Sequence, residues 1–189
     1  MPRGDLAEPP AFMVAPTTCA RAAVRRFHEI GSAEARDYLT QSVVGRWLDH
    51  DNPSMASNAR AVLAGFDWYV VTALADGRPT SALNATSRIV LGSGHLDVRL
   101  DLVIEDDGAV AGRGIFWDGP MFDPGSAAVS AYAFAAALEA LYPDRTFASI
   151  GIWQARRQQR FEIAFSDALA QRAAVTALYE RLVGGGTSD

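Results

Sequence analysis

Apolar residues recur at intervals of three and four along the first part of the chain, the spacing of one face of an α-helix. This pattern predicts three helices, over about 17–30, 32–49 and 53–74. Ser32 begins the second with a capping hydroxyl, and Pro53 begins the third where its missing N–H leaves no hydrogen bond unmade. The first third of the chain is therefore expected to be helical.

After residue 79 the hydrophobic period changes from 3.6 to 2, which indicates strands. Strands are predicted over 81–91, about 96–104 and 110–118, with short turns between them. Short connections favour antiparallel pairing, so these strands form a meander. In the middle strand one continuous apolar row is expected to face the core, and it consists of Leu96, Val98, Leu100, Leu102 and Ile104.

The remaining chain alternates between the two periods. It predicts a helix over 126–141, strands over 146–155 and 161–165, and a last helix over 166–182. The fold class is therefore expected to be α+β: a mixed sheet with an antiparallel three-strand meander, followed by helix, strand, strand and helix, with the helices packed on the sheet.

Length and composition are typical of one globular domain, with 189 residues of which 49% are apolar and 21% charged. We expect a single domain over 17–183, with flexible tails over 1–16 and 184–189. No apolar run is long enough to span a membrane. The first 20 residues carry four prolines and no apolar signal core, so a cytoplasmic location is expected.

The sequence contains no lysine, and all 17 basic residues are arginine. This excludes Schiff-base catalysis, covalent attachment of pyridoxal phosphate and a P-loop lysine, because arginine stays protonated and cannot replace a titrating lysine. The formal net charge of −5 argues against non-specific binding to nucleic acid, which depends on neutralising phosphates.

Four segments carry a resemblance to a known family: RLDLVIEDDG, GRGIFWDG, AYAFAAALEALYPDR and SIGIWQARRQQRFE. Their order over 53–183 resembles the RecB-like branch of the PD-(D/E)XK nuclease superfamily. The resemblance implies a restriction-endonuclease-like fold. It also implies that Asp101 and Asp118 stand where the family holds Mg²⁺, the only cofactor expected if the protein is active.

The family's catalytic motif is degenerate in this chain. Pro120 stands at the lysine position that follows Asp118. Tyr132 matches the helix tyrosine, but Ala128 stands where the family has glutamine. The resemblance therefore implies the fold more than the activity.

Both aspartates also have a structural interpretation. Asp101 would pair with Arg99 or Arg113 on a solvated strand face, and Asp118 would end its strand in a turn.

The segment WQARRQQR combines an aromatic ring, amides and guanidinium groups. Such a combination can contact phosphates and stack on bases. The alternative is a charged hairpin tip at a sheet edge. The residues concerned are Trp153, Gln154, Arg156, Arg157 and Arg160.

The sequence is compatible with three functions. The first is a non-catalytic nuclease-like module that works in a complex with nucleic acid or another protein. The second is a metal-dependent nuclease with a rearranged site formed by Asp101, Asp118 and Glu105. The third is an α+β barrel or cone that holds a small ligand against aromatic walls, which would be Phe116, Trp117 and Trp153.

Two further expectations concern packing. The helix over 126–141 is alanine-rich and apolar around most of its girth, so it is covered either by its own domain or by a second copy of the chain. Trp117 and Trp153 lie within strands bounded by apolar residues, so both are expected to be buried.

Overall fold

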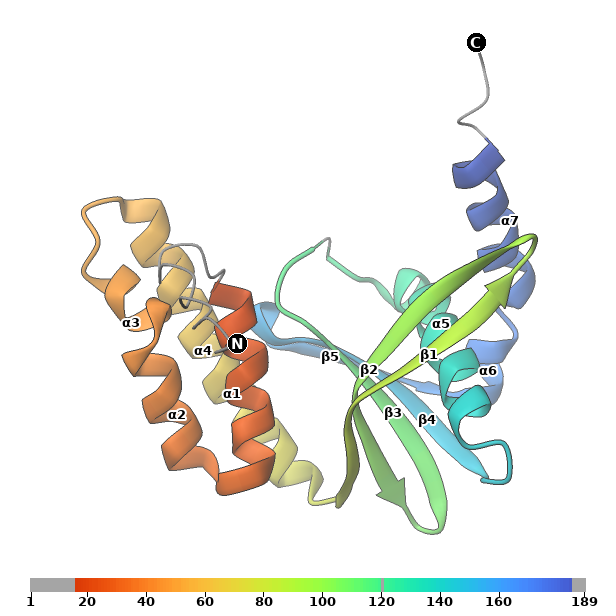
Figure 1. Ribbon diagram of the computed structural model, residues 1–189, viewed down its shortest axis with the longest axis horizontal. Coiled ribbons are helices and arrows are strands. Elements are labelled where there is room, and N and C mark those ends of the chain that lie inside the picture. Colours follow the sequence, from red (N-terminus) through yellow and green to blue (C-terminus); the bar gives the residue numbers. More distant parts are fainter. Residues whose placement is uncertain (1–15, 120, 185–189) are drawn as a thin grey trace, which may run out of the picture. The chain divides into compact units, whose positions relative to one another are not determined.

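A computed structural model describes residues 16–119 and 121–184 (Figure 1). Pro16 begins the first helix and Gly184 ends the last, and the rest of both predicted tails lies outside the described residues. The sequence predicts one domain, and the contacts of the described residues group them into two compact units. The helical unit contains residues 16–75 and 155–157; the sheet unit contains 76–154, apart from residue 120, and 158–184.

Four helices make up most of the helical unit. They are α1 (Pro16–Ile30), α2 (Ser32–Gln41), α3 (Val43–Leu48) and α4 (Pro53–Asp76), of which Asp76 already belongs to the sheet unit.

The prediction of one helix over 32–49 is wrong, because the chain breaks at Ser42. This residue is extended, with φ −76° and ψ −171°. Its hydroxyl donates to the carbonyl of Leu39 at 2.5 Å and accepts from the backbone N–H of Val44 at 3.4 Å. A serine side chain competes with helical backbone bonding in this way, and here it becomes the N-cap of α3.

The interior of the helical unit contains several fully buried side chains, among them Leu39 and Phe66. His28 Nε2 lies 2.6 Å from the hydroxyl of Tyr69. Burial lowers the pKa of His28, because an apolar environment disfavours its charged form.

Five strands form the sheet in the order β1-β2-β3-β4-β5. The first three are an antiparallel meander; β4 pairs parallel with β3, and β5 pairs antiparallel with β4. This is the predicted α+β arrangement, and it is consistent with a restriction-endonuclease-like fold. The strands are β1 (Thr80–Leu91), β2 (Gly94–Asp106), β3 (Ala109–Phe116), β4 (Phe147–Gln154) and β5 (Gln159–Ala164).

Helix α5 (Pro124–Leu141) connects β3 to β4 and packs on one face of the sheet. Gly114 allows close packing, since a Cβ there would lie 2.6 Å from the ring of Phe134. Ala127, Ala131 and the other small buried residues of α5 lie in the same core, so α5 is covered within the chain.

The sequence predicts one last helix over 166–182, and this is also wrong. The chain forms α6 (Phe165–Leu169) and α7 (Arg172–Gly184), separated at Ala170 and Gln171. The backbone N–H of Ala170 bonds the carbonyl of Ser166 and ends α6. A second helix then begins from the carbonyl of Gln171.

The predicted apolar row of β2 is not continuous. Val98 and Leu100 pack in the core beneath α5, but the next member of that core is Val103. Leu102 instead pairs with Arg113 on the opposite face. The row changes face opposite a β1 segment that contains a residue with φ +52°, Asn84, so the simple alternation of a regular strand fails there.

Candidate functional site

Arg113 lies in β3 on the sheet face opposite α5, and its side chain is 0% exposed. The strand alternates there between Gly112 and Gly114, which face α5, and Arg113, which faces the other way. Gly151 is its direct neighbour on β4. A Cβ at Gly151 would collide with Cδ of Arg113, so this glycine makes room for the arginine stem.

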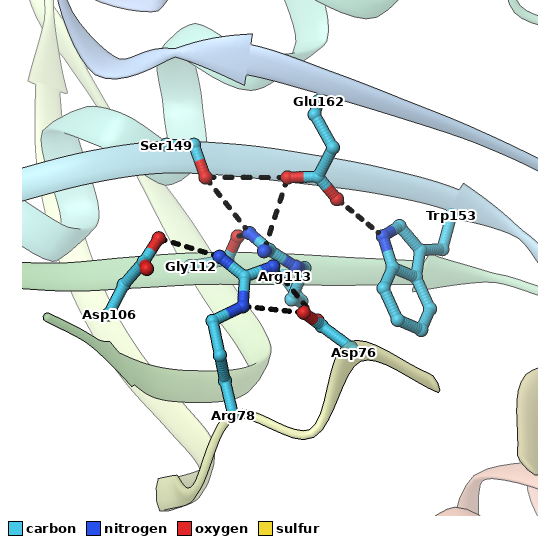
Figure 2. A network of polar contacts seen from close by, with 8 residues as sticks. All are labelled: Asp76, Arg78, Asp106, Gly112, Arg113, Ser149, Trp153 and Glu162. Atoms are coloured by element: carbon cyan, nitrogen blue, oxygen red, sulfur yellow. Dashed lines mark hydrogen bonds and ion pairs between the residues drawn. The ribbon is translucent and has the colours of Figure 1, made fainter. Parts of the chain in front are cut away.

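One edge of the guanidinium group of Arg113 is bound by the chain itself (Figure 2). Nη1 donates to the carbonyl of Gly112 at 2.9 Å and to Oγ of Ser149 at 3.4 Å. Nη2 lies 3.1 Å from Oε2 of Glu162 on β5. These contacts fix the position of the guanidinium group between three neighbouring strands.

Glu162 is held by further donors. Trp153 donates its indole N–H to Oε1 at 3.1 Å, and Ser149 donates to Oε2 at 3.3 Å. The guanidinium carbon of Arg113 lies 5.9 Å from the centre of the Trp153 ring, within the range of a cation–π interaction.

A second arginine completes this network, which we call the Arg113 network: Asp76, Arg78, Asp106, Arg113, Ser149, Trp153 and Glu162 (Figure 2). Arg78 binds both oxygens of Asp76, at 2.5 and 2.9 Å, and Oδ2 of Asp106 at 2.6 Å. The hydrogen bonds with Asp76 raise the pKa of Arg78. These ion pairs fasten the segment before β1 to the end of β2.

Burial lowers the pKa of Arg113, and the charge of Glu162 acts in the opposite direction. The group remains a cation, because arginine side chains stay protonated in proteins. The network therefore contains two arginines and three carboxylates, a net charge of −1.

Two donors of Arg113, Nε and Nη2, have no hydrogen-bond acceptor among the described residues, and neither has Nε1 of the buried Trp117. The contact between Nη2 and Glu162 is an ion pair without hydrogen-bond geometry. A buried donor without an acceptor costs about 1–3 kcal/mol, so each such group requires an explanation.

The sequence pattern suggests Arg113 only as an ion-pair partner of Asp101, and its place in a buried network was missed. The available signal was the run Gly112–Arg113–Gly114, a charged residue between two glycines within a strand whose other members are apolar. An arginine at an inward strand position with small neighbours indicates a guanidinium group buried against the sheet.

The predicted metal residue Asp101 is engaged by the sheet. Its Oδ2 accepts the backbone N–H of Ile115 at 2.7 Å, and its Oδ1 lies 3.3 Å from Nη2 of Arg99. The backbone of β2 pairs with β3 only from Leu102 onward, so Ile115 lies beyond the paired segment. The carboxylate of Asp101 therefore accepts the N–H of Ile115 in place of a backbone carbonyl of β2.

The other predicted carboxylates lie elsewhere. Asp118 is exposed, two residues beyond the end of β3. Glu105 binds Arg145 at 2.6 Å. Within residues 16–119 and 121–184, no three His, Cys, Asp or Glu side chains are grouped to hold a metal ion.

The segment WQARRQQR is divided by the fold. Trp153 and Gln154 are buried, and Gln154 accepts the backbone N–H of Phe122 at 3.1 Å. Arg157 and Arg160 are exposed, and Arg156 is half-buried. Trp153 is the partner of Arg160 across β4 and β5, but its ring is buried and donates to Glu162, whereas Arg160 is exposed.

The aromatic walls of the predicted small-ligand site are divided as well. Phe116 packs beneath α5, with ring centres 5.1 Å from Phe122 and 6.1 Å from Phe134. Trp153 lies on the opposite face with Arg113. Trp117 and Trp153 are 2% and 1% exposed, which confirms the predicted burial, although Trp117 lies one residue beyond the end of β3, whereas the sequence placed it within that strand.

Comparisons with known proteins do not identify the chain. No protein-family model matches it, and no curated protein matches it in sequence. Among the described helices, none is both long and apolar enough to cross a membrane.

Proposed function

We propose that this protein is a non-catalytic module with a nuclease-like fold, which works by binding another protein in a complex. The engagement of Asp101 with the backbone of β3 carries this proposal. The carboxylate of Asp101 stabilises the sheet by accepting a backbone N–H. A metal ligand would instead direct the lone pairs of its carboxylate oxygens toward the ion.

The missing chemistry supports the same function. Hydrolysis of a phosphodiester by this superfamily needs a carboxylate pair for the metal ion and a lysine for the attacking water. The chain has no lysine at any position, and Pro120 stands where the resemblance places it.

We expect the purified protein to leave DNA and RNA intact in the presence of Mg²⁺ or Mn²⁺. The measurement is a time course on labelled single- and double-stranded substrates, with a chelated sample as control. Asp101→Asn serves as the matched variant, because its amide oxygen still accepts the N–H of Ile115 while the charge is removed. Metal-dependent cleavage that this variant lacks would instead favour the active nuclease.

A protein partner is favoured over nucleic acid by charge and by the burial of Trp153. The net charge of −5 opposes the approach of a polyanion. Trp153 is buried and donates to Glu162, so it is not available to stack on a base.

Nucleic acid remains the second candidate because Arg157 and Arg160 are exposed and Arg156 is partly so. If these side chains neutralise phosphates, the triple glutamine variant binds duplex DNA more weakly at every sequence. Its salt slope of log K also falls by about 0.9 for each phosphate that the variant no longer neutralises.

The titration compares wild type and variant at several salt concentrations. A second triple glutamine variant has the same total charge as the first. A difference between the two therefore reports where the arginines lie and not how many are lost. Equal affinity and equal slope in the two variants would eliminate this candidate. The control replaces three exposed arginines elsewhere with glutamine, namely Arg25, Arg172 and Arg181.

A further inference from the structure

The two unsatisfied donors of Arg113 lie on the same edge of its guanidinium group. Nε–H and one Nη2–H point in parallel from that edge and form a fork that matches two oxygens of a single oxyanion. The opposite part of the group, at Nη1, is already bonded to Gly112 and Ser149. Arg113 therefore presents a bidentate donor edge while the rest of its side chain is held in place.

Other arginines of this chain show what binds the same edge. In each of three cases Nε donates at 2.5–2.7 Å and Nη2 at 2.9–3.1 Å to the two oxygens of one aspartate. The pairs are Arg36 with Asp67, Arg78 with Asp76, and Arg88 with Asp97.

The carboxylates of the Arg113 network have other donors. Asp76 and Asp106 bind Arg78. Glu162 binds the indole of Trp153 and the hydroxyl of Ser149, and its ion pair with Arg113 lacks hydrogen-bond geometry. The fork is therefore left for a group from outside the described residues.

We propose that the Nε/Nη2 edge of Arg113 is a binding site for a carboxylate, supplied by an acidic side chain of the partner protein. The geometry and charge of the Arg113 network favour a carboxylate as the ligand. That a partner protein supplies this carboxylate rests on the proposed function. A singly charged carboxylate fits better than a phosphate dianion, because the network already has a net charge of −1. Since Arg113 has no exposed surface, the ligand enters only when neighbouring side chains move, so association is slower than diffusion.

The test uses acetate as the probe and the full chain in solution. Nitrogen–proton NMR spectra resolve the Nε–H signals of arginine and the indole signals of tryptophan. Titration with acetate, against chloride at equal ionic strength, is expected to change the Nε–H signal of Arg113 and the indole signal of Trp153 saturably. The Nε–H signal of Arg88 is the internal control, because Asp97 already binds its fork.

Two variants separate the fork from the charge. Arg113→Lys keeps a cation but offers no bidentate edge, and Arg113→Met removes the charge while filling the space. Both are expected to lose the saturable response of the Trp153 indole signal, and Arg88→Lys is expected to retain it. If one of the two Arg113 variants fails to fold, the other is enough for this comparison. The wild-type titration with acetate tests the proposal without either variant.

Several outcomes would overturn the assignment. One is an unchanged Arg113 signal in acetate. Another is an equal Trp153 response in Arg113→Lys. A saturable response to inorganic phosphate but not to acetate would replace the carboxylate with a phosphate. Because acetate requires no partner and no cleavage assay, this inference and the proposed function fail separately.

Discussion

Replacing Glu162 with alanine is expected to lower the free energy of unfolding by about 3 kcal/mol. This change leaves the fully buried guanidinium group of Arg113 without its counter-ion, a loss that typically costs about 3–5 kcal/mol for buried pairs. The lower end applies because the side chain of Glu162 is 36% exposed, and water partly replaces it. The indole N–H of Trp153 loses its acceptor in the same variant.

The matched variant is Arg113→Met, which removes the buried charge and leaves an apolar side chain of similar length. We expect its free energy of unfolding to lie within about 1 kcal/mol of wild type, because the buried charge is removed and the carboxylate that remains, Glu162, is 36% exposed and keeps Trp153 and Ser149 as donors. Urea denaturation at constant m-value measures both variants. A loss of equal size in Arg113→Met would mean that Arg113 stabilises the fold, and it would count against a binding role for the Nε/Nη2 edge.

Replacing Trp153 or Trp117 with alanine is expected to cost about 3–5 kcal/mol each, as truncation of large buried side chains does. Their exposures of 1% and 2% place both rings in well-packed surroundings, so a cavity remains when they are removed. Urea denaturation again provides the measurement.

Two controls accompany the tryptophan variants. Trp153→Phe keeps most of the ring volume but lacks the donor to Glu162, so it separates packing from hydrogen bonding. Val90→Ala changes an apolar side chain that is 63% exposed, and a change below about 0.5 kcal/mol is expected there. Losses below about 1 kcal/mol at both tryptophans would contradict their placement in the core.

Hydrophobic periodicity along the chain determined the number and order of most helices and strands, and with short connections it determined the antiparallel meander. The period of apolar residues reports which side of an element is buried, and this depends on a few neighbours in sequence. The burial of Trp153 followed from the same local pattern, whereas Trp117 is buried just beyond the end of β3. The helix breaks at Ser42 and near Ala170 did not follow from this pattern, because the apolar spacing continues across both. The hydroxyl of Ser42 bonds the carbonyl of Leu39 at the first break, and the N–H of Ala170 bonds the carbonyl of Ser166 at the second.

The candidate site was decided by the tertiary structure. Arg113, Ser149 and Glu162 lie on three strands, and only the parallel pairing of β3 with β4 brings Gly151 beside the arginine stem. The same pairing places Trp153 beside Ile115 of β3. Asp101 is a strand residue that the motif assigns to a metal, but its bond to Ile115 arises where β2 separates from β3. Sequence spacing cannot show which donors remain unsatisfied, because that depends on the positions of all neighbouring acceptors in space.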